Sequence, residues 1–233
     1  MPHRPSAPSG RSGASRHLSG QPIKHYRPTG QPQIRRLVDD GFQAFNAGRL
    51  SEACRVYSDK MLDPGNDVTI GLTMAGALTP AGLGGCVIDP SRDVNEVAAI
   101  ILSGTRNGCV ILGGGSPKNF YLQGQPTLWE IYGIPKGGNE YFIQITTDQV
   151  VWGGLSGATP SEAVSWGKVN PGMLPDAVVA YCDTTIAFPI FCEYAVGSSH
   201  ARRPRRELVH RRDELVAELE RQARDRAEGD GGD

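Results

Sequence analysis

Short apolar strands alternate with helical segments along residues 31–201, and this alternation limits the fold more than any other feature of the sequence. Apolar, β-branched runs occupy residues 67–74, 108–112, 141–147 and 177–181. Segments with helical spacing or helix-capping residues flank them, at 33–63, 90–101, 117–132, 159–166 and 184–196. Short strands that are apolar throughout are typical of parallel sheets covered by helices. The sequence therefore predicts an α/β, Rossmann-like fold with a mostly parallel sheet and helices on both faces.

Local signals predict several element boundaries. Pro90 and Pro117 each stand where a first helical turn is expected, because proline is favoured there. Ser116 and Asp183 are of the residue types that cap helix N-termini. Gly48 is expected to break the helical pattern of residues 33–63.

Two tails of different composition flank the α/β domain at 31–201. Residues 1–30 contain five basic residues, no acidic residue and many Pro, Ser and Gly, so we predict a disordered basic tail. Residues 202–233 contain nine basic and nine acidic residues. Their apolar residues recur at roughly helical spacing, which predicts an exposed, charged helix.

Charge, hydropathy and cysteine usage exclude several classes of protein. The formal net charge of −1 argues against a nucleic-acid binder, and residues 31–201, with 10 basic and 16 acidic residues, favour a cationic substrate. No apolar run of about 18 residues is present, so we expect no transmembrane helix. The first thirty residues lack the apolar core of a signal peptide. Five widely spaced cysteines without a CxxC pair indicate reduced thiols in a cytoplasmic protein with no metal site.

Two glycine-rich turns follow predicted strands, at residues 75–85 and at Gly113, Gly114 and Gly115. A strand, a glycine turn and a helix N-terminus together form a cradle for a phosphate or dinucleotide. A tight turn that needs positive φ explains the same pattern equally well. Both turns would lie at the carboxyl edge of the sheet, where ligands of α/β proteins bind.

The segment 156–168 concentrates residues capable of chemistry. Thr159 and Glu162 have capping-box spacing, so Glu162 is either a capping carboxylate or a ligand-binding acid. Lys168 follows Gly167 and lies near Trp166. An exposed lysine after a helix C-terminus is one interpretation of this residue. The other is a lysine desolvated against the indole, which lowers its pKa and makes it a nucleophile able to form an imine.

Four stretches of the domain resemble the deoxyhypusine synthase family, in particular its bacterial deoxyhypusine synthase-like branch. The most specific is EAVSWGK at 162–168, and the others are ILGGGSPKNF at 111–120, GLSGATPSE at 154–162 and YCDTTIAFP at 181–189. The resemblance extends over residues 45–197, which is most of the domain.

This resemblance implies a transferase with NAD as cofactor and a tetrameric assembly. In that family NAD takes a hydride from spermidine, and the aminobutyl group passes through a lysine imine to an acceptor amine. Lys168 would be the nucleophile, and Glu162, Trp166 and Asn119 would contact the polyamine. The residues implied to contact NAD are Gly113, Gly114, Gly115, Thr147, Asp183 and Thr184.

The sequence also departs from the family. Asn119 replaces a substrate-contacting histidine of the eukaryotic enzymes, while Trp152 and Leu155 replace acids. The chain passes almost directly from Gly85 to Val87, where family members carry a long central segment. Two hypotheses follow: an NAD-dependent aminobutyl transferase with an unspecified acceptor amine, or a non-catalytic, shortened paralogue that assembles with a full-length homologue.

Overall fold

The computed structural model describes residues 32–75, 89–202 and 206–229. The predicted disordered tail at 1–30, most of the first glycine-rich turn and the junction after Gly85 lie outside these residues. The sheet contains β1 (Val68–Met74), β2 (Arg106–Leu112), β3 (Tyr141–Thr146) and β4 (Ala177–Tyr181). All neighbouring strands are parallel, in the order β1-β2-β3-β4. The α/β prediction is therefore confirmed, with each strand within two residues of its predicted bounds.

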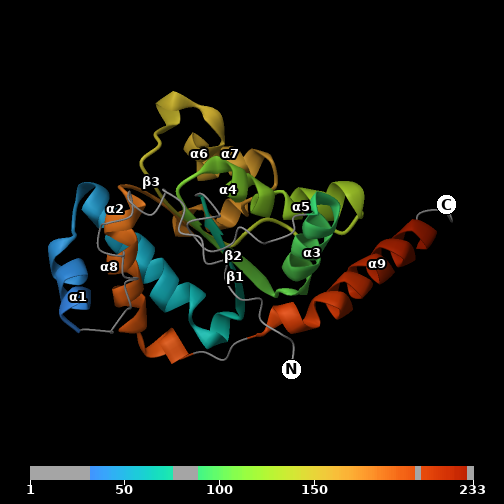
Figure 1. Ribbon diagram of the computed structural model, residues 1–233, viewed down its shortest axis with the longest axis horizontal. Helices are drawn as coiled ribbons and strands as arrows, with labels where there is room; N and C mark the ends of the chain where they lie inside the picture. Colours follow the sequence, from blue (N-terminus) through green and yellow to red (C-terminus); the bar gives the residue numbers. More distant parts are fainter. Residues whose placement is uncertain (1–31, 76–88, 203–205, 230–233) are drawn as a thin grey trace, which may run out of the picture.

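Alternate residues of the strands enter two different cores, one on each face of the sheet. Val110, Ile143 and Val178 point into the core formed with α2 (Phe45–Arg55) and α8 (Thr184–Val196). Their neighbours in the strands, among them Ile111 and Phe142, point into the core on the opposite face. Figure 1 shows α1 (Pro32–Arg36), α2 and α8 on one side of the sheet and α3, α4, α5, α6, α7 and α9 on the other. Helices thus cover both faces, as predicted.

The first helical segment breaks at a different place from the one predicted. After α1 and the π-helical turn η2 (Leu37–Gly41), the chain leaves the helix at Phe42, and Ala44 is fully extended before α2 begins. Gly48 lies inside α2, so the expectation of a break there is wrong. A Cβ at Gly48 would lie 3.3 Å from the backbone of Gln43, so glycine there allows the preceding loop to fold back onto the helix. α2 continues into η3 (Val56–Met61), and η4 (Pro64–Asn66) leads to β1.

The opposite face is covered mainly by α3 (Pro90–Ser103), α4 (Gly115–Leu122) and α7 (Pro160–Ser165). The remaining short elements between α4 and β4 are α5 (Gly124–Pro126), η5 (Thr127–Ile131), η6 (Val150–Trp152), α6 (Gly154–Gly157) and η7 (Pro171–Asp176). Asp89 caps α3 by accepting a hydrogen bond from the Arg92 amide. Ser116, however, is not a cap: α4 begins at Gly115, one residue before it. The helix expected at 117–132 is divided among α4, α5 and η5.

The charged C-terminal segment forms η9 (Leu208–Arg211) and α9 (Arg212–Gly229), after η8 (Ser199–Arg202). α9 was expected to be exposed, but one face packs against α3, and Leu219 is only 1 % exposed. Figure 1 shows the helix running alongside α3 and then projecting beyond it. The apolar face therefore belongs to a core, while the charged residues face outward. Within the described ranges, no helix is both long and apolar enough to span a membrane.

Candidate active site

A cavity of about 420 Å³ lies between α4, α6 and α7. It brings together Asn119, Glu162, Trp166 and Lys168, four of the residues singled out in the sequence. The remaining lining residues are Lys118, Leu122, Gln123, Leu155, Ala158, Thr159, Ala163 and Ser165. The cavity is the centre of the candidate active site.

Local structure determines where Lys168 lies. α7 ends at Ser165, and Gly167 adopts a left-handed conformation with φ of 67°, which glycine tolerates best. The Lys168 amide donates to the Ala163 carbonyl at 2.9 Å. The Lys168 carbonyl accepts from both the main-chain amide (3.0 Å) and the side-chain amide (2.9 Å) of buried Asn139. The backbone at Lys168 is thus held from both sides while its side chain points into the cavity.

The Lys168 ammonium has a neutral environment. Its Nζ donates to Asn119 Oδ1 at 2.9 Å and lies 5.7 Å from the centre of the Trp166 ring. Among the described residues, no carboxylate forms an ion pair with it. Partial burial lowers the pKa of Lys168 below its ordinary value. A lysine in such surroundings loses its proton more readily than an exposed one, which favours nucleophilic attack.

Glu162 serves as a helix cap in this structure. Its carboxylate accepts hydrogen bonds from the Thr159 amide at 2.6 Å and the Thr159 hydroxyl at 3.2 Å, while the Thr159 hydroxyl accepts from the Glu162 amide. The capping-box interpretation is confirmed. Because Glu162 also lines the cavity, its negative charge remains available to a bound cation.

Lys118 is a second lysine at the cavity, and the sequence analysis did not assign it a role. It is only 3 % exposed, and its Nζ donates to Gln144 Oε1 at 3.0 Å and to the Ala158 carbonyl at 2.6 Å. Burial lowers the pKa of Lys118 from 10.5 to about 8. In the sequence, Lys118 could have been noticed only from its position, directly before Asn119 and one helical turn after a glycine triplet.

The glycine triplet is closely packed against its own chain. Gly113 has φ of 74°, and a Cβ on Gly114 would come within 2.4 Å of Ala75. A Cβ on Gly115 would come equally close to Leu155, which lines the cavity. The triplet therefore brings the start of α4 into direct contact with α6, so the turn and the lysine cavity are adjacent.

The other residues predicted to contact NAD also lie at the carboxyl edge of the sheet. Thr147 directly follows β3 and is exposed. Asp183 and Thr184 follow β4; the Asp183 carboxylate caps α8 through the Thr185 amide, and the Thr184 hydroxyl donates to the Ile145 carbonyl. These hydrogen bonds to Thr185 lower the pKa of Asp183.

Of the two residues that replace family acids, only Leu155 is at the cavity. Trp152, in η6, is largely exposed and does not line the cavity. The wall at Leu155 is consequently apolar where the resemblance placed a carboxylate, and Glu162 is the only acidic residue that lines the cavity among the residues the structure describes.

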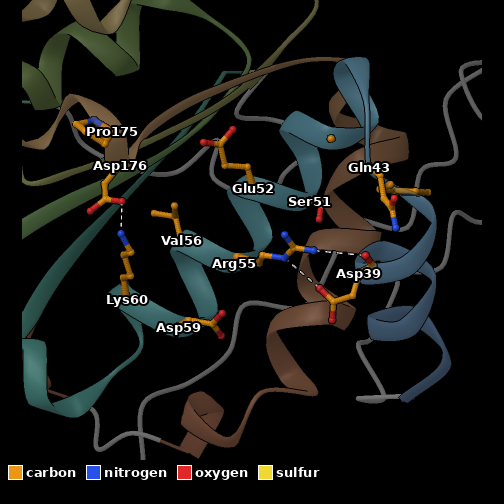
Figure 2. Close-up of a pocket in the computed structure, with 12 residues that line it drawn as sticks. Asp39, Gln43, Ser51, Glu52, Arg55, Val56, Asp59, Lys60, Pro175 and Asp176 are labelled. Atoms are coloured by element: carbon orange, nitrogen blue, oxygen red, sulfur yellow. Dashed lines mark hydrogen bonds and ion pairs between the residues drawn. The ribbon is translucent and has the colours of Figure 1, made fainter.

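A larger cavity, of about 780 Å³, lies on the other side of the sheet, between η2, α2, η3 and η7. Figure 2 shows two ion pairs among its charged side chains. Arg55 bonds Asp39 at 3.2 Å, and Lys60 bonds Asp176. None of the candidate site residues lines this larger cavity. We therefore interpret it as a surface hollow with ion pairs, and not as part of the candidate active site.

About half of the chain matches a known protein family. Residues 84–195 match the family model described as deoxyhypusine synthase. Deoxyhypusine synthase-like proteins of Nostoc punctiforme and a Cyanothece species are both 47 % identical, over 160 and 165 residues; each match covers 66 % of this chain and 40 % of the relative.

A probable deoxyhypusine synthase 2 of Methanosarcina acetivorans is 47 % identical over 103 residues, which covers 44 % of this chain and 29 % of that protein. The chain thus spans about 40 % of the length of the cyanobacterial relatives. The match to the family model thus assigns the segment 84–195, which contains the lysine cavity, to the deoxyhypusine synthase family.

Proposed function

We propose that this protein is an NAD-dependent aminobutyl transferase that takes its aminobutyl group from spermidine or a related polyamine and passes it, through an imine on Lys168, to an acceptor amine. The observation that supports this most directly is the environment of Lys168. Its amine faces a cavity, contacts an amide oxygen and an indole instead of a carboxylate, and has a lowered pKa.

The residues at the carboxyl edge fit NAD. Gly114, the residue before α4, provides no side-chain cap, so amides of the first turn are available to a pyrophosphate. Among the described residues, a Cβ on Gly113 would meet only Ala75, at 3.9 Å. Gly113, Gly114, Gly115, Thr147, Asp183 and Thr184 would hold the cofactor. When bound, NAD would accept a hydride from the amine and return it at the end of the reaction.

The residues of the cavity would carry out the transfer itself. Oxidation of the polyamine converts its secondary amine to an imine. The neutral amine of Lys168 then attacks the imine carbon, the carbon–nitrogen bond to the departing diamine breaks, and a proton passes to that diamine. An acceptor amine next displaces Lys168 from the new imine, which restores the lysine before reduction.

The surface charge and the aromatic wall favour a polyamine. Glu162 would attract an ammonium group, and Trp166, which is 68 % exposed, presents an indole face to a cation. Lys118, being cationic and fixed by Gln144, would repel ammonium groups from one end of the cavity. The acidic domain increases the local concentration of polycations.

Borohydride trapping tests this proposal. The protein is incubated with NAD and spermidine labelled in its butyl portion, reduced, and digested for peptide mass spectrometry. We expect label on Lys168, and none in Lys168→Arg. Lys136 provides the matched control, because burial also lowers its pKa and it lies away from the cavity. Lys136→Arg should keep full labelling; label that persists in Lys168→Arg would refute the proposed nucleophile.

The second candidate is a non-catalytic paralogue that acts with a full-length homologue. The apolar wall at Leu155, where the resemblance placed a carboxylate, favours it. Purified protein that binds neither NAD nor polyamine, but forms a stable complex with a longer homologue, would support this candidate. We also propose that the protein is cytoplasmic and oligomeric, which is compatible with either function.

A further inference from the structure

We propose that Asn139 is a positioning residue for Lys168: by holding the main chain of that lysine, it keeps the reactive amine inside the cavity. This inference rests on the proposed function for the part that the amine plays in the transfer. Asn139 lies two residues before β3 and is completely buried, at 0 % exposed. The sequence analysis assigned no role to this asparagine.

The main chain at Lys168 depends on hydrogen bonds from outside the preceding helix. α7 ends at Ser165, and Gly167, with φ of 67°, turns the chain out of the helical direction. The Lys168 carbonyl oxygen accepts from another segment, at 3.0 Å from the main-chain amide and at 2.9 Å from the side-chain amide of Asn139. Because a carbonyl oxygen has two lone pairs, this one asparagine satisfies it completely.

The contact between the two segments continues past Lys168. Asn139 and Val169 form a parallel bridge, and the Asn170 amide donates to the Asn139 carbonyl at 3.0 Å. A Cβ on Gly138 would come within 2.5 Å of the Val169 main chain, so the segments lie closer together than any other residue at position 138 would permit. The main chain that follows the lysine is therefore fixed against residues 138–139.

The side-chain amide of Asn139 is itself oriented by its partners. Its Nδ2 faces the Lys168 carbonyl, which can only accept, and its Oδ1 lies 3.4 Å from the Tyr121 hydroxyl. Burial raises the pKa of Tyr121, so this hydroxyl keeps its proton and can donate. Tyr121 belongs to α4, as does Asn119, which accepts from Lys168 Nζ. α4 thus holds the lysine at both ends: directly at the amine, and through Asn139 at the main chain.

Loss of the Asn139 amide should therefore change the amine more than the fold around it. Nζ stands at the end of a flexible four-carbon side chain, so a small rotation of the main chain displaces it from Asn119 and Trp166. Since partial burial lowers the pKa of Lys168, that pKa would return toward its ordinary value. A reacting group misplaced by about 1 Å can lose about a hundredfold in rate.

The experiment is acetylation of the purified chain from about pH 7 to pH 11, read by peptide mass spectrometry, which gives the pH midpoint of labelling at Lys168 without NAD or polyamine. We expect Asn139→Ala to raise this midpoint, and to reduce borohydride-trapped spermidine label at Lys168 at least about tenfold. Asn107→Ala is the matched control. This equally buried side-chain amide donates to a main-chain carbonyl of α3, that of Ile101 at 3.1 Å, and should leave both readouts unchanged.

Tyr121→Phe is a second variant in case Asn139→Ala does not fold. It keeps the ring, which packs so closely on Gly71 that a Cβ there would lie 2.4 Å away, and removes only the hydroxyl beside Asn139. We expect a smaller rise of the same midpoint.

The proposal is overturned if the Lys168 midpoint stays unchanged in folded Asn139→Ala, or in Tyr121→Phe where Asn139→Ala does not fold. An equal rise in Asn107→Ala also overturns it, because lost stability alone would then explain the shift. A native protein that takes no label from spermidine would contradict the proposed function instead, and the acetylation profiles would still decide whether Asn139 positions the lysine.

Discussion

Lys118 should make the free energy of unfolding rise with pH, and Lys118→Met should remove this contribution. Its ammonium group is buried beside Gln144 and the Ala158 carbonyl, and burial lowers its pKa from 10.5 to about 8. Between these two values the unfolded chain binds a proton that the folded chain has released. The free energy of unfolding therefore rises with pH across this interval.

The magnitude follows from the two pKa values of Lys118. At pH 7 both states are protonated, and keeping the ammonium in the fold costs about 3 kcal/mol relative to the neutral amine. At pH 10 the folded lysine is neutral and about 1 kcal/mol of that cost remains. Lys118→Met should thus lose about 2 kcal/mol of stability relative to the native protein between pH 7 and pH 10.

The native protein must be compared with Lys118→Met, because other buried groups lower the free energy of unfolding as the pH rises. Burial raises the pKa of Cys54 and of Cys109 to about 12, so these thiols stay protonated in the fold after those of the unfolded chain ionise. They lower the stability above about pH 9. Both thiols are present in Lys118→Met, so their effect cancels in the difference.

Urea unfolding followed by circular dichroism, at pH values from 7 to 10, measures this difference. A constant slope with denaturant confirms that the variant unfolds from the same compact state. Lys60→Met, at an exposed lysine paired with Asp176, is the control and should follow the pH dependence of the native protein. The difference in free energy of unfolding between the native protein and Lys118→Met should change with pH. If it stays constant within about 0.5 kcal/mol from pH 7 to pH 10, burial does not lower the pKa of Lys118 as argued.

Three other substitutions test the cavity and the packing around it. Asn119→Asp would place a carboxylate against Lys168 Nζ and raise the pKa of that lysine, so its acetylation at pH 8, followed by peptide mass spectrometry, should slow roughly tenfold. Gly115→Ala would bring a Cβ to 2.4 Å from Leu155 and should destabilise the fold by about 1–3 kcal/mol in urea unfolding. Leu219→Ala should cost about 2–4 kcal/mol in the same assay, because α9 packs through this residue.

Each of these three substitutions has a control variant that changes a similar side chain without the proposed contact, charge or packing. Asn119→Ala adds no charge and should leave Lys168 at least as reactive as in the native protein. Gly172→Ala meets only the Asn170 side chain, at 3.5 Å, and Val209→Ala alters an exposed side chain; both should stay within about 0.5 kcal/mol of the native stability. An unchanged stability in Leu219→Ala would contradict the packing of α9, and unchanged acetylation in Asn119→Asp would contradict the contact with Lys168.

Features governed by neighbouring residues were predictable from the sequence. The capping box of Thr159 and Glu162 and the Asp183 cap each join residues no more than three positions apart, so their residue types alone indicate them. The strands were recognisable because an unbroken apolar run has few alternatives in a covered sheet. The break before α2 escaped prediction because it depends on Gln43 packing against Gly48, which no periodicity expresses.

The candidate site also contains one contact that local sequence explains and others that depend on distant segments. Trp166 and Lys168 are two residues apart, and a local turn at Gly167 brings them together. The contact between Lys168 and Asn119 joins residues 49 positions apart, and it exists only because α4 and α7 lie on the same face of the sheet. The burial of Lys118 likewise depends on Gln144 of β3 and on the loop at Ala158.

The sequence by itself indicated the four strands, the capping box at Thr159 and the Asp183 cap, because these depend on residue type and short-range spacing. Only the tertiary structure decided the sequential order of the parallel strands and the packing of α9 on α3. It also decided that the ammonium of Lys168 faces an amide oxygen and not a carboxylate. Each of these depends on contacts between distant segments, whose free energy is gained only when the chain has collapsed into one arrangement.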